Sequence, residues 1–203
     1  MKQLVYLFLV LTNTIFAQTS PFNQVKATNI GPTIMSGRVV DLAVNPKNPT
    51  EFYVAYASGG LWYTQNNGTS FSPVMDTANT INCGSVTVDW SSGTLWVGTG
   101  EVNASRSSYA GIGLLTSSDK GKTWKNLGLI DSHHISKIWV NPSNLNEIVV
   151  AALGHLYTTN KERGIFKSSD GGKSWQQTLY VADDTGIVDL AVSKTNPNVM
   201  FAA

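Results

Sequence analysis

Short runs of hydrophobic residues recur along this chain, each of strand length and each followed by a polar turn. Four of these runs resemble one another and occupy residues 39–46, 85–90, 135–142 and 187–193. Their hydrophobic residues either alternate with polar ones or continue without a break, as in half-buried or fully buried strands. No long stretch has the period of an amphipathic helix. The pattern therefore predicts an all-β protein.

Each run opens a unit of about 50 residues in which we expect three further strands. The second strands are expected at residues 51–56, 94–98, 147–152 and 199–203, and the third at 60–63, 112–115 and 164–167. The fourth begins at an aromatic residue. Four antiparallel strands in a unit of this length are typical of a propeller blade.

The repeats predict a β-propeller arc of three complete blades and half of a fourth. We expect the blades at about residues 31–80, 81–131 and 132–183, with an incomplete one at 184–203. Propellers typically close with about four to eight blades. We therefore expect a fragment of a longer protein, and the alternative is a ring assembled from several short chains.

An octet is repeated between the third and fourth strands. Residues 117–124 read SSDKGKTW and residues 168–175 read SSDGGKSW, while residues 64–71 read TQNNGTSF. Its Asp or Asn can accept nearby backbone amides, its Gly can adopt positive φ, and its Trp can fill the space between sheets. We expect the two Trp side chains to be largely buried. The residues assigned this structural role are Asn66, Gly68, Asp119, Gly121, Trp124, Asp170, Gly172 and Trp175.

The octets fit the pattern S-x-D-x-G-x-[ST]-W of the Asp-box, or bacterial neuraminidase repeat. Together with the segments WVGTGE at 96–101 and RGIFK at 163–167, they make residues 31–203 resemble exported bacterial propellers related to the sortilin N-terminal domain. Such proteins are often labelled glycosyl hydrolases. The resemblance implies a propeller but leaves the activity open, because sialidases, xyloglucanase-type glycosidases, sortilins and photosystem assembly factors all carry Asp-boxes.

The first 17 residues have the pattern of a signal peptide. Lys2 gives a positive start, residues 4–16 are mostly apolar, and Ala17 precedes the expected cleavage point. The apolar run is shorter than the roughly 20 residues that span a bilayer. We therefore expect a secreted, periplasmic or cell-surface protein with no membrane span after cleavage.

Charge and cysteine content add two expectations. Only 13% of the residues are charged and the formal net charge is +1, so nothing indicates a nucleic-acid partner. Cys83 is the one cysteine of the sequence and is expected to be a small buried hydrophobe.

The candidate binding residues are expected on the face where loops enter the first strands and join the second to the third. They are Arg38, Glu101, Arg106, Tyr109, His134 and Asp184. The longest of these loops, residues 98–113, has no counterpart of similar length in the other units, which favours a role in recognition. The structural alternative makes Arg38 and His134 ordinary strand-end residues and pairs Glu101 with Arg106 in a local ion pair.

Two functions stay open: a module that binds a peptide, protein or glycan, and a glycoside hydrolase. A hydrolase needs two carboxyl groups, about 5 Å apart for retention or about 6.5–9.5 Å apart for inversion. Glu101 and Asp184 would form such a pair only across the channel. The sequence favours the binding module, because no motif ties a second carboxylate to Glu101.

Two other kinds of enzyme are less favoured. A sialidase would use three arginines, but Arg38, Arg106 and Arg163 lack the Arg-Ile-Pro type of segment such enzymes resemble. A metal enzyme is not expected, because the adjacent residues His133 and His134 should point to opposite faces of a strand. Calcium binding by the octets is not expected either, since no bidentate Glu follows at the required spacing. We expect no cofactor.

Overall fold

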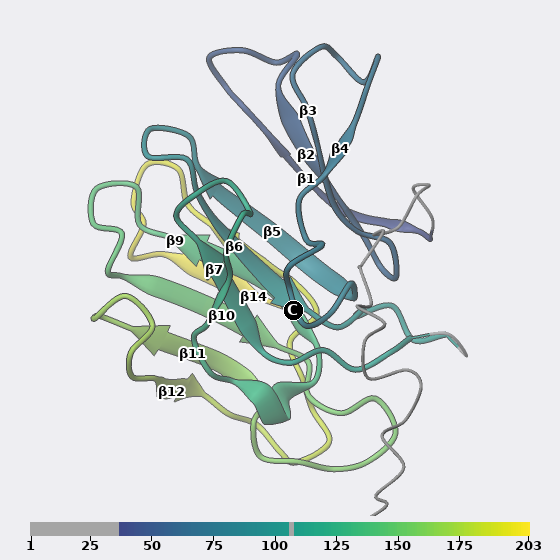
Figure 1. Ribbon diagram of the computed structural model, residues 1–203. Coiled ribbons are helices and arrows are strands. Elements are labelled where there is room, and N and C mark those ends of the chain that lie inside the picture. Colours follow the sequence, from purple (N-terminus) through teal and green to yellow (C-terminus); the bar gives the residue numbers. More distant parts are fainter. Residues whose placement is uncertain (1–36, 106–107) are drawn as a thin grey trace, which may run out of the picture.

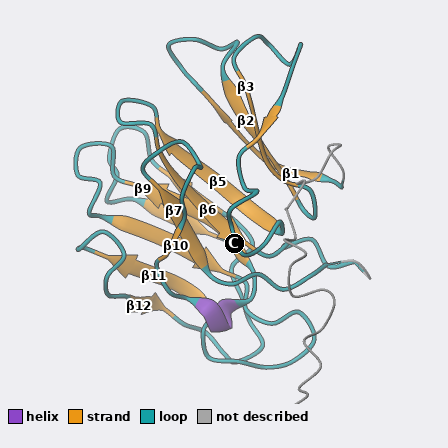
Figure 2. Cartoon of the chain, in the orientation of Figure 1, coloured by secondary structure: helices purple, strands orange, loops and turns teal. Residues whose placement is uncertain are grey.

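The computed structural model describes residues 37–105 and 108–203. These residues form three four-stranded antiparallel sheets and one two-stranded sheet, which follow one another in chain order (Figures 1 and 2). The described part is almost entirely β, with the short 3-10 helix η2 (Ile130–Ser132) before the third sheet. This confirms the expected arc of three complete propeller blades and half of a fourth. The expected signal peptide and Arg106 lie outside the described residues.

Within the described ranges, none of the helical segments combines the length and the apolar character needed to cross a membrane.

Each complete sheet is a meander in which consecutive strands pair. The first sheet contains β1 (Val39–Val44), β2 (Phe52–Tyr56), β3 (Gly60–Thr64) and β4 (Ser72–Pro73). The second contains β5 (Cys83–Asp89), β6 (Thr94–Thr99), β7 (Leu114–Ser117) and β8 (Lys125–Asn126). The third contains β9 (Ile135–Val140), β10 (Ile148–Ala152), β11 (Gly164–Ser168) and β12 (Gln176–Leu179), and the half blade contains β13 (Leu190–Val192) and β14 (Met200–Ala202).

The first strands of successive blades lie side by side, β5 between β1 and β9. Side-chain hydroxyls join these strands to the next blade. Thr87 Oγ1 donates to the Ile138 carbonyl at 2.8 Å, and Ser136 Oγ donates to the Ile187 carbonyl at 2.6 Å. These hydrogen bonds join the backbone of one blade to side chains of the blade before it.

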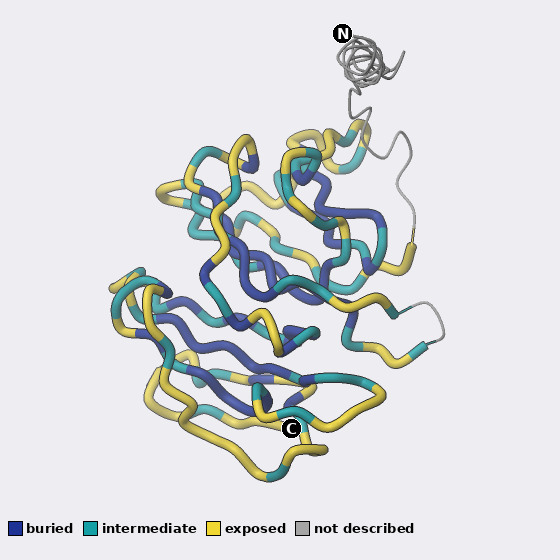
Figure 3. The backbone as a smooth tube through the Cα atoms, turned by 60° about the horizontal axis from the view of Figure 1, so that its bottom comes forward, coloured by how far each residue is buried: buried dark blue, intermediate teal, exposed yellow. Residues whose placement is uncertain are grey.

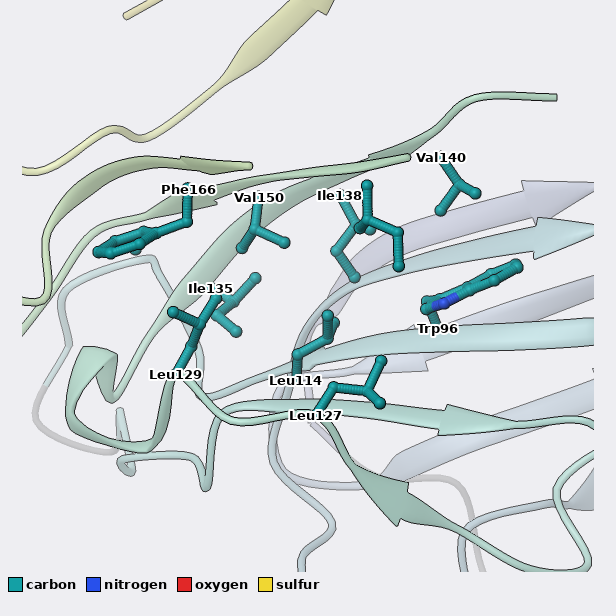
Figure 4. Close-up of a cluster of buried hydrophobic side chains, with 11 residues drawn as sticks. Trp96, Leu114, Leu127, Leu129, Ile135, Ile138, Val140, Val150 and Phe166 are labelled. Atoms are coloured by element: carbon teal, nitrogen blue, oxygen red, sulfur yellow. The ribbon is translucent and has the colours of Figure 1, made fainter. Parts of the chain in front are cut away.

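Hydrophobic side chains fill the space between blades (Figure 4). The cluster between the second and third blades contains Trp96, Leu114, Leu127, Leu129, Ile135, Ile138, Val140, Ile148, Val150, Ala152 and Phe166. Cys83 lies in the cluster next to the first blade, is fully buried, and has its Sγ 3.5 Å from Met75 Sδ. It is the small buried hydrophobe that the sequence predicts. In Figure 3 the buried residues lie mostly along the central strands, and the exposed residues lie mostly in turns, loops and outer strands.

The octets form turns that are closed by their own side chains. Asp119 Oδ1 accepts the Thr123 amide at 2.9 Å and Asp119 Oδ2 accepts the Thr123 hydroxyl at 2.6 Å, while Ser117 Oγ accepts the Gly121 amide at 2.8 Å. Hydrogen bonds from Thr123 lower the pKa of Asp119 to about 2. Asp170 makes the equivalent contacts in its own turn.

Trp124 and Trp175 are neither fully exposed nor fully buried: each is of intermediate burial and packs against a hydrophobic cluster between blades. Trp124 Nε1 donates to the Val74 carbonyl at 3.1 Å and Trp175 Nε1 donates to the Leu127 carbonyl at 2.7 Å. Each indole thus reaches the preceding blade. The accepting carbonyls directly follow the outer strands β4 and β8, each of which is two residues long.

Candidate functional site

The loops between second and third strands and the segments that enter first strands meet at one end of the blades. Gly111 N donates to the His133 carbonyl at 2.7 Å, and Asn160 N donates to the Asp183 carbonyl at 3.0 Å. We call this surface the loop face and define it as residues 100–105, 108–113, 129–134, 153–163 and 180–187. It is where the sequence predicts ligand recognition.

Glu101 and Arg38 form an ion pair between two blades. Arg38 Nε donates to Glu101 Oε1 at 2.6 Å, Arg38 Nη2 binds Glu101 Oε2, and Ser108 Oγ donates to Oε2 at 3.3 Å. The side chain of Glu101 is 1% exposed and that of Arg38 is 49% exposed. Among the described residues the charged partner of Glu101 is Arg38. Arg106, the partner in the structural alternative, lies outside them. Both carboxylate oxygens are thus occupied and shielded from solvent.

His134 is buried beside Glu101, just before β9. Burial and the neighbouring His133 lower the pKa of His134 to about 4, against the opposing effect of a hydrogen bond with the Glu101 backbone. Its Nδ1 is buried and has no hydrogen-bond partner among the described residues. His134 is therefore a neutral residue at pH 7, in contact with the loop that carries Glu101.

The remaining candidates do not join this group. Tyr109 is 58% exposed, and Asp184 lines a pocket of about 360 Å³ between residues 153–163 and the segment that enters the half blade. The described part of the chain contains no hydrogen bond or ion pair between Glu101 and Asp184. The structure thus brings together Arg38, Glu101 and His134. Tyr109 is exposed on the loop that carries Glu101, and Asp184 lines the pocket beside the half blade.

Arg163 lines this pocket and holds the loop that forms one side of it. Its guanidinium is buried and donates to the carbonyls of Leu153 at 2.8 Å, His155 at 2.5 Å and Thr158 at 2.7 Å. Gly154 has φ +81°, and a Cβ there would lie 2.3 Å from Arg163 Cγ. Arg163 therefore holds a loop in one conformation, a role that sequence reasoning missed because its three partners are backbone carbonyls.

One cluster of potential metal ligands occurs among the described residues: Asp131, His133 and His155. The expectation placed His133 and His134 on a strand, but both precede β9, and His133 directly follows η2 with φ +56°. His133 stacks on His155, with ring centroids 3.6 Å apart and an interplanar angle of 19°. The sequence expectation considered only the pair of neighbours and missed a partner in the next loop.

The comparisons with known proteins identify the fold. No protein-family model and no curated protein matches the chain. An ancestral GH74 enzyme has a similar structure (TM-score 0.66, 21% identity), with 87% of this chain and 23% of that chain covered. The GH74 xyloglucanase from Xanthomonas campestris is also similar (TM-score 0.58, 18% identity), with 79% of this chain and 26% of that chain covered. YCF48 bound to D1 peptide is similar as well (TM-score 0.53, 15% identity), with 79% of this chain and 46% of that chain covered.

The chain therefore spans less than half the length of each of these proteins. At identities this low, the similarity establishes the β-propeller fold alone.

Proposed function

We propose that this chain belongs to an exported β-propeller that binds a peptide, protein or glycan on its loop face. The observation that carries the proposal is the pocket of about 360 Å³ beside residues 153–163, whose wall is fixed by Arg163. A loop held in one conformation before binding loses little conformational entropy when a ligand arrives. A concave, preformed surface with a few polar groups is the usual form of a binding site.

An exposed aromatic ring at this pocket supports the proposal. Tyr157 is 74% exposed, yet its hydroxyl donates to the Ser105 carbonyl at 2.9 Å, which ties the loop of the third blade to that of the second. A tyrosine held at its tip but open along its ring offers a flat apolar surface, which suits a sugar ring or a peptide side chain. Tyr109 is a second exposed ring on the neighbouring loop.

Family and location are part of the same proposal. The octets support membership of the Asp-box propellers related to sortilin, and residues 1–17 support export. In the solved relatives, YCF48 binds D1 peptide and the Xanthomonas campestris protein is a xyloglucanase, so a peptide or a glycan is the class of ligand to test first.

Glycoside hydrolysis is the second candidate, favoured by the GH74 folds. It requires a carboxyl group that can exchange a proton with the glycosidic oxygen, and a second carboxylate within about 9.5 Å. Glu101 is 1% exposed and its oxygens are bound by Arg38 and Ser108. An anchoring role fits these contacts better than acid or base catalysis.

Peptide and glycan arrays probed with the secreted chain test the proposal. Tyr157→Ala should weaken binding of the selected ligand by about 10-fold, which corresponds to about 1.4 kcal/mol. Phe201→Ala is the matched control, because Phe201 is 71% exposed on β14 and lies outside the loop face.

Turnover of an aryl-glycoside and glycan panel separates the two candidates. Hydrolysis by the wild type that disappears in a folded Glu101→Gln variant would replace the binding module with a hydrolase, because an amide cannot act as acid or nucleophile.

A further inference from the structure

Three side chains with metal-binding atoms meet on the loop face. Asp131 lies in η2, His133 directly follows it, and His155 comes from the loop after β10. His155 Nε2 lies 3.3 Å from Asp131 Oδ1, and one ligand atom from each of the three residues lies within 4.8 Å of the others. Ligand atoms around a tetrahedral Zn²⁺ are about 3.3 Å apart. The pair of His155 and Asp131 already has that spacing. His133 is stacked on His155 with ring centroids 3.6 Å apart, so its ring has to turn out of the stack before both imidazole nitrogens can face one ion.

Neighbouring groups orient these side chains. His155 Nδ1 lies 2.8 Å from Thr158 Oγ1, which leaves Nε2 directed toward Asp131. Asn160 Nδ2 donates to the Asp131 carbonyl at 2.6 Å, and Asn160 Oδ1 accepts the His155 amide at 3.0 Å. Metal-binding histidines typically have their second ring nitrogen held in this way by a protein group.

The backbone around the cluster is unusual for its residue types. Leu129 and His133, on either side of η2, both have φ +56° without being glycine. Such conformations cost free energy and tend to occur where a site requires a particular side-chain position. Here the two residues flank the turn of η2 that carries Asp131.

The charges near the cluster also favour a cation. Glu162 Oε2 is buried without a hydrogen-bond partner among the described residues. A divalent cation would relieve the repulsion between the carboxylates of Asp131 and Glu162.

We propose that Asp131, His133 and His155 form a binding site for one divalent transition-metal ion, Zn²⁺ in particular. Two imidazole nitrogens and one carboxylate oxygen are a donor set that suits Zn²⁺, whereas Ca²⁺ and Mg²⁺ prefer oxygen ligands alone. Three protein ligands leave a fourth position open. Because His155 also lines the pocket of the loop face, that position adjoins the pocket, where a donor atom of a bound ligand could occupy it. This last point alone rests on the proposed function.

Isothermal titration of the metal-free, untagged chain with ZnCl₂ tests the site. We expect one Zn²⁺ per chain with a dissociation constant in the micromolar range or below, and no competition by millimolar Mg²⁺ or Ca²⁺. His155→Gln and Asp131→Asn should each weaken binding at least 10-fold. Glu147→Gln is the matched control, because it removes a partly exposed carboxylate that pairs with Lys167 outside the loop face, and it should leave the affinity unchanged.

A third variant removes a contact without removing a ligand. Thr158→Val deletes the hydroxyl beside His155 Nδ1 and should weaken Zn²⁺ binding several-fold while the exposed position tolerates the change. Cys83 is fully buried and cannot substitute for a lost ligand in the folded chain. Absence of saturable binding below 1 mM Zn²⁺, or equal affinity in wild type, His155→Gln and Asp131→Asn, would overturn the proposal.

Discussion

Replacing Arg163 with lysine should loosen the loop that forms the pocket wall. The guanidinium donates three hydrogen bonds to the carbonyls of Leu153, His155 and Thr158, and its planar fork reaches all of them at once. A lysine ammonium keeps the charge but is expected to reach one carbonyl, so about two hydrogen bonds are lost. Each hydrogen bond from a charged donor contributes about 1.5–3 kcal/mol, part of which water restores. We expect the free energy of unfolding to fall by about 2–4 kcal/mol.

The assay is urea denaturation followed by tryptophan fluorescence, with the melting temperature as a second readout. The expected loss corresponds to a decrease in Tm of about 4–16 °C for a domain of this size. Lys167→Arg is the control, because Lys167 is 42% exposed in a surface ion pair and its exchange should change stability by less than about 0.5 kcal/mol. An Arg163→Lys variant that unfolds at the wild-type urea concentration would refute the role assigned to Arg163.

Three further predictions concern the turns and the core. Asp119→Ala and Asp170→Ala should lower Tm and leave ligand binding intact, because each carboxylate closes its own turn. Folding lowers the pKa of Asp119 to about 2 from an unfolded value of about 4. The stability that this carboxylate gives to the folded chain is therefore complete above pH 4 and is lost as the pH falls toward 2. The decrease in Tm over that pH range should be smaller in Asp119→Ala than in the wild type. Trp124→Ala should lower the free energy of unfolding by about 3 kcal/mol. Trp124→Phe should lower it by less, since Phe keeps most of the apolar contact and loses only the N–H bond to the Val74 carbonyl. Equal urea midpoints for the two variants would contradict this. Cys83 should resist a thiol reagent in the native chain at pH 8, because burial raises the pKa of its thiol to about 12. Rapid modification before unfolding would show that the first and second blades do not pack as described.

The fold could be predicted from the sequence because its determinants are local. Strand periodicity depends on residues two apart, and the octet turn is closed by side chains within four positions of Asp119, such as Thr123. The same short-range chemistry recurs in every unit, so the repeats themselves reveal the blade. The partner of the Trp124 indole was harder to predict, since the Val74 carbonyl is 50 positions away in the preceding blade.

The site was predicted only in part, because its contacts join residues that no repeat relates. Glu101 was a candidate, but its partner Arg38 is 63 positions away in another blade. His133 and His155 belong to different loops, and their stacking follows from the positive φ of His133 and from the loop that Arg163 holds. Loops without a repeating pattern carry no sequence signal of which residues they bring together.

Hydrogen exchange with and without an array-selected ligand is the measurement that tests the central claim most directly. Binding on the loop face predicts slower amide exchange in residues 153–163 and 180–187, and unchanged exchange in the octet turns at the opposite ends of the third strands. Protection confined to the octet turns at residues 117–124 and 168–175, with none in the loops, would contradict the claim that this face binds the ligand.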